Sequence, residues 1–145
     1  MSEAFVTQAA QRFISLRGER AFARLRKGRR GHHKFVSVRW LPCKRPYLQA
    51  GRDPRLDKRY LDKRTGQSQR VSRVGIVVSK KVGNAVVRNK VRRRLREGLY
   101  ALWLEQPPKH SPVDLMIIAK PDAAKASYWQ LKAGLAYALC KSQLL

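Results

Sequence analysis

The sequence is poor in acidic residues. Its 145 residues include 9 Asp and Glu against 33 Lys and Arg, which gives a formal net charge of +24 at pH 7. A chain with this excess repels itself and binds non-specifically unless a polyanion compensates the charge, so the composition favours a nucleic-acid partner. Arginine occurs from Arg12 to Arg96 and not beyond. We therefore expect the last third of the chain to be structural.

Cysteine and long apolar runs are also scarce. Cys43 and Cys140 lie far apart, without the spacing of a metal site or a framework of disulfides, so reduced thiols in the cytoplasm are expected. The longest apolar run, Leu115 to Ala119, is too short to span a bilayer, and the N-terminus lacks a basic region followed by an apolar run. We expect a soluble cytoplasmic protein without a membrane partner, and no obligate protein partner is evident.

Motifs of protein-borne catalysis are missing from the sequence. It contains no HExxH, no GxxxxGK[ST], no cysteine pair at zinc spacing and no closely spaced carboxylates suited to a hydrolytic cleft. His32, His33 and His110 lie in loop-like sequence, where solvated side chains are the simpler interpretation. No catalytic or metal-binding residue is predicted, so any chemistry must be performed by another molecule.

The strongest positive signal is the segment from Ser79 to Leu99, in which eight cationic side chains precede the first acid, Glu97. At about 100° per residue, an apolar stripe predicts a helix that faces a core. Like charges three or four residues apart cost about 0.2–0.5 kcal/mol per pair, which an anionic partner would offset. A solvated basic face remains the alternative. The stripe consists of Val87, Val91, Leu95 and Leu102, with Gly98 and Leu99 beside it; Arg88, Arg92 and Arg96 form the adjacent row, Asn89 and Arg93 a second row, and Asn84 is the expected N-cap.

The remaining patterns predict an α-β-β-α-β-α order. A short basic helix is expected within residues 15–27, and residues 1–14 are expected to be frayed or a short helical lead. Residues 43–70 are expected to be a mobile basic insertion within a single domain, 1–145, which either contacts RNA or acts as a solvated linker. The fold class is therefore an α/β (α+β) two-layer sandwich with a small sheet. The predicted strands are residues 34–41, with Val36, Val38 and Trp40 on one face, 71–78 and 113–119, and a last helix begins at Ser127 and packs through Leu131, Leu135 and Leu139.

The run GIVVSKKVGN, from Gly75 to Asn84, continues as AVVRNKVRR and resembles the signature of the bacterial ribonuclease P protein subunit. The family's RNR motif would fall on Arg88, Asn89 and Lys90. The resemblance implies a left-handed β-α-β crossover through the basic helix. It also implies a ribonucleoprotein endonuclease in which an RNA with bound magnesium removes the 5′ leader of precursor tRNA, assisted by the protein. A ribosomal or rRNA-assembly protein remains the alternative.

The resemblance also implies two sets of contact residues. Arg26 and Val38 stand where the family often has aromatic residues, and Arg94 stands where an apolar residue is usual. Ordinary core packing remains open for Phe22 and Phe35. The set expected to bind the catalytic RNA is Lys80, Lys81, Asn84, Arg88, Asn89, Lys90, Arg92, Arg93 and Arg96, and the set expected in the leader-binding cleft is Phe22, Phe35, Val38 and Trp40.

Overall fold

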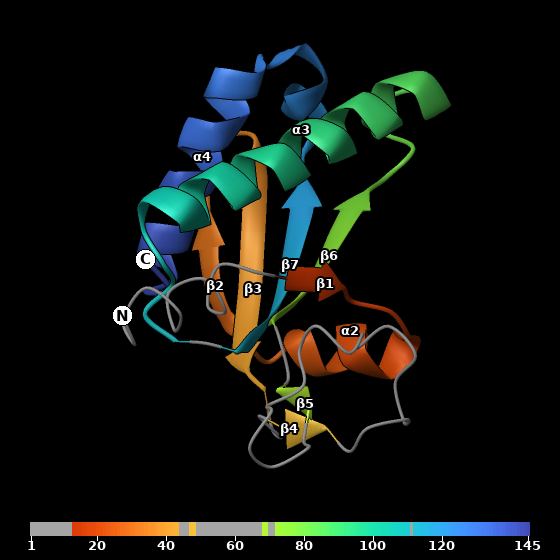
Figure 1. The fold of residues 1–145 in the computed structure, drawn as a ribbon. Coiled ribbons are helices and arrows are strands. Elements are labelled where there is room, and N and C mark those ends of the chain that lie inside the picture. The colour runs from red at the N-terminus through yellow and green to blue at the C-terminus, as the bar shows by residue number, and fades with distance from the viewer. Residues whose placement is uncertain (1–12, 44–46, 49–67, 70–71, 111) are drawn as a thin grey trace.

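A five-stranded sheet with helices on both faces forms the body of the protein (Figure 1). The computed structural model describes residues 13–43, 47–48, 68–69, 72–110 and 112–145. Parallel pairs join β1 to β6 and β6 to β7, and antiparallel pairs join β7 to β3 and β3 to β2. In sheet order the strands are β1 (Phe13–Ser15), β6 (Ser72–Val78), β7 (Val113–Ala119), β3 (Val36–Pro42) and β2 (Arg29–His32).

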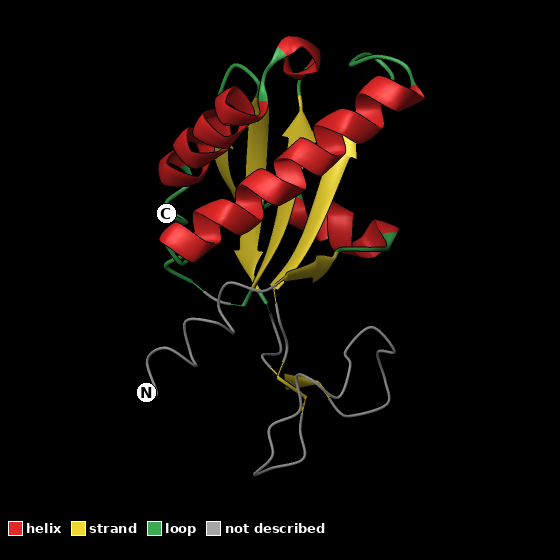
Figure 2. Ribbon diagram, turned by 45° about the horizontal axis from the view of Figure 1, so that its top comes forward, coloured by secondary structure: helices red, strands yellow, loops and turns green. Residues whose placement is uncertain are grey.

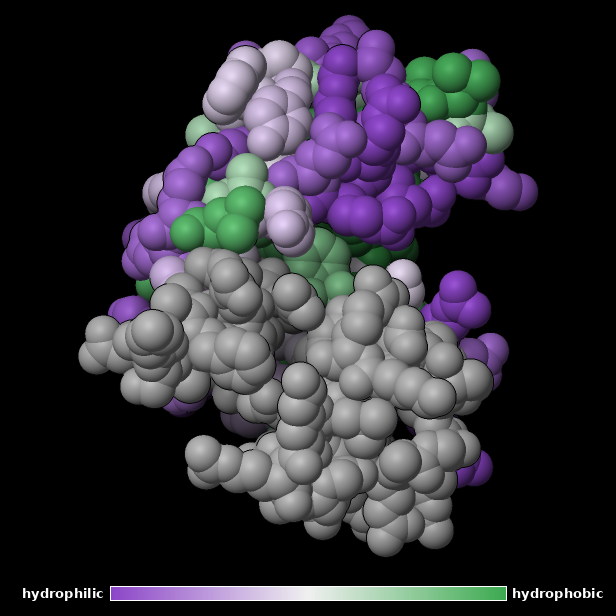
Figure 3. All heavy atoms as spheres, viewed as in Figure 1, coloured by the Kyte–Doolittle hydropathy of each residue, from purple (hydrophilic) through white to green (hydrophobic). Residues whose placement is uncertain are grey.

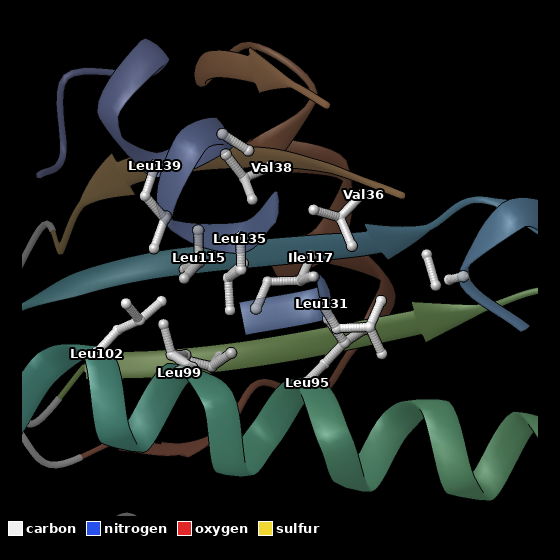
Figure 4. Packing of buried hydrophobic residues seen from close by; sticks show 14 of the residues in the cluster. Val36, Val38, Leu95, Leu99, Leu102, Leu115, Ile117, Leu131, Leu135 and Leu139 are labelled. Atoms are coloured by element: carbon white, nitrogen blue, oxygen red, sulfur yellow. The ribbon is translucent and has the colours of Figure 1, made fainter. Parts of the chain in front are cut away.

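Helices α3 (Ala85–Glu105) and α4 (Tyr128–Lys141) cover one face of the sheet, and α2 (Glu19–Leu25) lies on the other (Figure 2). Alternation along β3 places Val36, Val38 and Trp40 on one face of the sheet, as predicted, and this is the face that α3 and α4 cover. Their partners are the predicted stripes of the two helices (Figure 4). The stripes include Leu95, Leu99 and Leu102 of α3 and Leu131, Leu135 and Leu139 of α4, and all six are buried.

The crossover from β6 through α3 to β7 is left-handed. In Figure 1 both strands point upward, α3 crosses in front of them, and β7 lies to the left of β6. Nearly all β-α-β crossovers between parallel strands are right-handed. The resemblance, and not the residue pattern, implied this exception.

Two strands of the sheet were missed. Residues 13 and 14 were expected in a frayed or short helical lead and Ser15 in the first helix, but the three residues form β1, and the Phe13 ring packs edge-on against Trp103 at 5.5 Å between ring centroids. β2 was hidden because its sequence, RRGH, has no apolar alternation. A Cβ at Gly31 would overlap the backbone carbonyl of Ala138, so glycine lets α4 approach this edge strand closely.

The other boundaries agree to within a few residues. The first helix is shorter than predicted, since α2 begins at Glu19 and ends at Leu25. Of the predicted insertion, the structure describes Cys43 and the two-stranded pair β4 (Tyr47–Leu48) and β5 (Ser68–Gln69). The remainder of 43–70 lies outside the described residues. Within the described part of the chain, no helix combines the length and apolarity needed to cross a membrane.

Candidate RNA interface

The start of α3 is fixed by the predicted N-cap. Asn84 Oδ1 accepts a hydrogen bond from the backbone N–H of Val87 at 3.0 Å, which satisfies one of the unpaired amides of the first turn. In the preceding turn Val82 is buried, and its N–H donates to the carbonyl of Ser79. Lys80 and Lys81 are exposed on the same turn. The turn therefore holds two cations beside the N-terminus of α3.

The flank of α3 next to the buried stripe carries the predicted row of arginines. Arg88 and Arg92 are half-buried and Arg96 is exposed. Arg92 Nη1 donates to Asn89 Oδ1 at 3.2 Å, so the two predicted rows are in contact. The Nε of Arg88 is buried and has no hydrogen-bond partner. A buried donor without an acceptor is costly to the free protein.

Among the described residues, no acid forms an ion pair with this row. The ion pairs among the described residues are Arg24 and Arg73 with Asp114, and Lys132 with Glu105. Hydrophilic side chains accordingly dominate the surface over α3 (Figure 3). Arginines without an acidic neighbour keep their guanidinium groups available for bidentate contacts with phosphate. The arrangement suits the backbone of a folded RNA.

The opposite face of the sheet holds a shallow hollow beside α2. Its lining includes Phe22 and Arg26 together with Gly18, Glu19 and Ala23. The Phe22 ring lies directly on Gly75 of β6, since a Cβ there would come within 2.6 Å of the ring. Phe22 also packs against the small cluster of Leu16, Leu25 and Met116. An aromatic edge beside a cation suits an unpaired nucleotide.

Comparison with known proteins agrees with this geometry. The family model described as Ribonuclease P matches residues 10–143. The chain belongs to this family. It is 46% identical over 134 residues to the ribonuclease P protein component of Thermus brockianus, and 44% identical over 138 residues to that of Thermus aquaticus. These matches cover 92% and 95% of the chain but 63% and 65% of the relatives, so the chain spans less than two thirds of their length.

Solved structures of Ribonuclease P family proteins share the fold. The Staphylococcus aureus RNase P protein matches with a TM-score of 0.63 and 24% identity, over 90% of this chain and 95% of that one. The RNase P protein from Thermotoga maritima matches with a TM-score of 0.58 and 21% identity, over 84% and 91% of the two chains. At this identity the likeness supports the architecture alone.

Three of the four residues predicted for the Ribonuclease P leader cleft lie elsewhere. Val38 and Trp40 are 0% and 1% exposed in the core under α3 and α4, and Trp40 Nε1 donates to the carbonyl of Ser142 at 2.9 Å. Buried side chains cannot contact an RNA strand, so we remove these two from the set. Phe35 packs against that same core cluster, whereas Phe22 packs against the α2 cluster. Only Phe22 lines the hollow.

Two cations that the prediction left out lie on the face of the sheet toward α2. Arg39 of β3 lies opposite Arg30 of β2 and, on its other side, opposite Met116 of β7. Met116 lies opposite Gly75 of β6, on which the Phe22 ring packs. Arg30 Nη2 also donates to the carbonyl of Arg26. Alternation along β3 was the available signal, because Arg39 lies between inward-facing Val38 and Trp40.

An ion cluster attaches α2 to the sheet. Asp114 of β7 is buried and accepts hydrogen bonds from Arg73 Nε and Nη2, at 2.9 and 2.7 Å, and from Arg24 Nη1 at 2.9 Å. Arg24 Nη2 also donates to the carbonyl of Pro42. No sequence pattern predicted this cluster, because Arg73 and Arg24 lie 41 and 90 residues away from Asp114. It holds α2 in place beside the hollow.

Arg94 has a structural contact. Its Nη1 donates to the carbonyl of Ala126 at 2.8 Å, which ties α3 to the segment just before α4. An arginine at a position where the family pattern expects an apolar residue is thus accommodated, because the guanidinium reaches a backbone acceptor at the edge of the core.

Metal ligands do not gather on the described part of the chain. No group of three or more His, Cys, Asp or Glu residues is placed to hold an ion there. The carboxylate of Asp114 is engaged by two arginines. The residues described therefore do not fit a protein-bound magnesium site.

Proposed function

We propose that the chain acts as the protein component of a ribonuclease P, the name its Thermus relatives carry. In this role it binds the catalytic RNA and the 5′ leader of precursor tRNA, and assists magnesium-dependent removal of the leader. The row formed by Arg88, Arg92 and Arg96 carries the proposal, because it is braced by a core-facing stripe and paired with no described acid.

The α3 surface would reduce repulsion between two RNAs. Catalytic RNA and precursor tRNA are both polyanions, and a row of cations at their junction lowers the free energy of bringing them together. Four further predicted residues are exposed and extend this charged surface. Lys80 and Lys81 lie on the turn before α3, and Lys90 and Arg93 lie on α3 itself. Contacts of this kind position the RNA without reading its sequence.

The hollow beside α2 would hold the leader. Phe22 offers a ring edge, and Arg26, Arg30 and Arg39 supply cations around it. With Val38 and Trp40 buried, charge contributes more to this contact than stacking does. We expect such a site to tolerate many leader sequences, since neither backbone contacts nor stacking on one ring distinguishes bases strongly.

Magnesium belongs to the RNA in this proposal. Bound there, it would activate the attacking water and stabilise the leaving oxygen. The protein's own residues take part in neither step. They position the two RNAs, and the charge they add should lower the magnesium concentration that the RNA needs for substrate binding.

A reconstitution experiment tests the proposal. The chain is added to the catalytic RNA and a precursor tRNA at a magnesium concentration too low for the RNA alone, and cleavage at the mature 5′ end is followed. We expect cleavage to be restored by the chain but not by polylysine of equal total charge. No change in rate would refute the assignment. Sequencing the RNA that co-purifies with the chain separates this role from rRNA assembly, because only the latter predicts rRNA as the main species.

A further inference from the structure

Three aromatic rings meet at the edge of the sheet where the turn after β2 contacts α4. The His33 ring lies 5.3 Å from the Phe35 ring and 5.4 Å from the Tyr137 ring, centroid to centroid, at interplanar angles of 55° and 60°. Tyr137 is 50% exposed, so one ring of the three offers a large open surface. We refer to His33, Phe35 and Tyr137 as the edge cluster.

The helix is shaped to admit this cluster. A Cβ on Gly134 of α4 would lie 2.5 Å from His33 Nδ1, so only glycine leaves room for the imidazole. Glycine inside a helix destabilises it relative to alanine. The backbone N–H of Phe35 donates to His33 Nδ1 at 3.3 Å. With Nδ1 accepting, the neutral imidazole carries its proton on Nε2 and can donate a hydrogen bond.

Cations lie at both ends of the cluster. Lys34 Nζ is 5.7 Å from the centroid of the Phe35 ring, and Lys141 Nζ is 5.5 Å from that of Tyr137. Both lysines are exposed, and neither takes part in an ion pair of the described residues. The cluster therefore combines an open ring, a donor and two uncompensated charges, which a single-stranded polyanion with stacking bases matches.

The edge cluster is separate from both surfaces described above. The contact between α3 and α4 is bridged by Lys132 and Glu105, at 2.7 Å, whereas Tyr137 and Gly134 face the turn after β2. In Figure 1, β2 and α4 lie at the left of the sheet and β6 at the right. The hollow with Phe22 is on the α2 face. An RNA bound along α3 would have to extend around α4 to reach the cluster.

We propose that the edge cluster is a second RNA-binding surface, which takes an unpaired nucleotide. The base stacks on Tyr137, and the flanking phosphates lie between Lys34, Lys141 and His33 Nε2. The inference rests on the proposed function only in assuming that the partner is RNA. It would let one protein chain hold two separated RNA segments.

Photo-crosslinking and binding test the surface directly. The probe is an eight-nucleotide oligouridylate with a fluorescent 5′ label and one 4-thiouridine, used with the full chain. We expect a crosslink to residues 33–35 or 137–141. We also expect Tyr137→Ala to weaken binding about fivefold to tenfold, the lower part of the range for one stacked base. Tyr137→Phe should retain binding, since it keeps the ring.

Trp129→Ala is the control, because Trp129 is an aromatic residue, 71% exposed at the start of α4, that lies outside both the edge cluster and the α3 row. Thermal melting checks that each variant folds. Wild-type affinity for Tyr137→Ala together with crosslinks confined to α3 or α2 would overturn the inference. Loss of self-association in Tyr137→Ala, seen by sedimentation, would overturn it in favour of an interface between copies. If cleavage is not restored but the probe crosslinks here, the proposed function fails and this surface stands; the reverse result removes this surface alone.

Discussion

Helices α2 and α3 are both rich in arginine, but their arginines differ in whether they have an acidic partner. In α2, Arg24 reaches the buried carboxylate of Asp114, which also binds Arg73. In α3, Arg88, Arg92 and Arg96 have no acidic partner among the described residues. The partner of an arginine, and not the number of arginines, therefore separates a structural cation from one available to an external anion.

The difference follows from how each helix is held. α3 has 21 residues and buries six of them, so apolar packing anchors it and its flank can carry repelling charges. α2 has 7 residues and buries only Leu25. So short a helix has little apolar area with which to hold itself, and the ion cluster adds a polar attachment. Helix α2 thus depends on the carboxylate of Asp114, whereas the arginine row of α3 pairs with no described acid.

Removing the carboxylate gives the largest expected effect. Asp114→Ala leaves Arg24 and Arg73 without their partner beneath α2. Loss of one member of a buried pair costs about 3–5 kcal/mol. Since these arginine side chains are 27% and 17% exposed, water compensates in part and we expect about 3 kcal/mol of lost unfolding free energy, measured by urea denaturation. Asp122→Ala, at an exposed acid, should leave stability unchanged. An equally small effect at Asp114 would contradict an attachment role for the cluster.

Removing the α3 row tests the other side of the comparison. The triple variant Arg88→Ala, Arg92→Ala, Arg96→Ala should flatten the salt dependence of RNA binding by about 0.7–0.9 in logarithmic slope per lost phosphate contact. Between 50 and 200 mM salt, the wild-type chain should then lose about 20- to 40-fold more affinity than the variant, or about 2 kcal/mol. Unfolding free energy should not fall, because the like-charge repulsion is relieved. An unaltered slope would show that these arginines do not contact RNA.

Much of the fold was predictable because helix and strand periods differ. The stripe at Val91 and Leu95 and the cap at Asn84 located α3, and the apolar run from Val113 to Ala119 matched β7 residue for residue. β1 and β2 were missed because strands of three or four residues are too short to show a periodic pattern. The handedness of the crossover is a property of chain connection, which no residue pattern of this sequence encodes.

The candidate site was likewise predictable only in part. The position of the arginine row on α3 could be predicted, because all of its residues lie at regular spacing within one helix. The hollow depends on residues from separate elements, and there the prediction failed for Val38 and Trp40, whose apolar alternation already placed them in the core. The structural role of Asp114 could not be predicted, because it depends on hydrogen bonds from Arg24 and Arg73, which lie 90 and 41 residues away in the sequence.

The smallest expected effect separates two neighbouring arginines of α3. Arg94 donates to the carbonyl of Ala126, whereas Arg93 is exposed on the predicted RNA-binding side. Arg94→Ala leaves a backbone acceptor at the core edge without its charged donor, so we expect a loss of about 1.5 kcal/mol in unfolding free energy and no change in the salt slope. Arg93→Ala should leave stability unchanged and lower the slope by about 0.7–0.9. Both variants can be measured by urea denaturation and by RNA titration at several salt concentrations. If both arginines changed the same quantity, position on the helix would not separate structural from RNA-binding arginines, and the distinction drawn between α2 and α3 would not extend to single residues within α3.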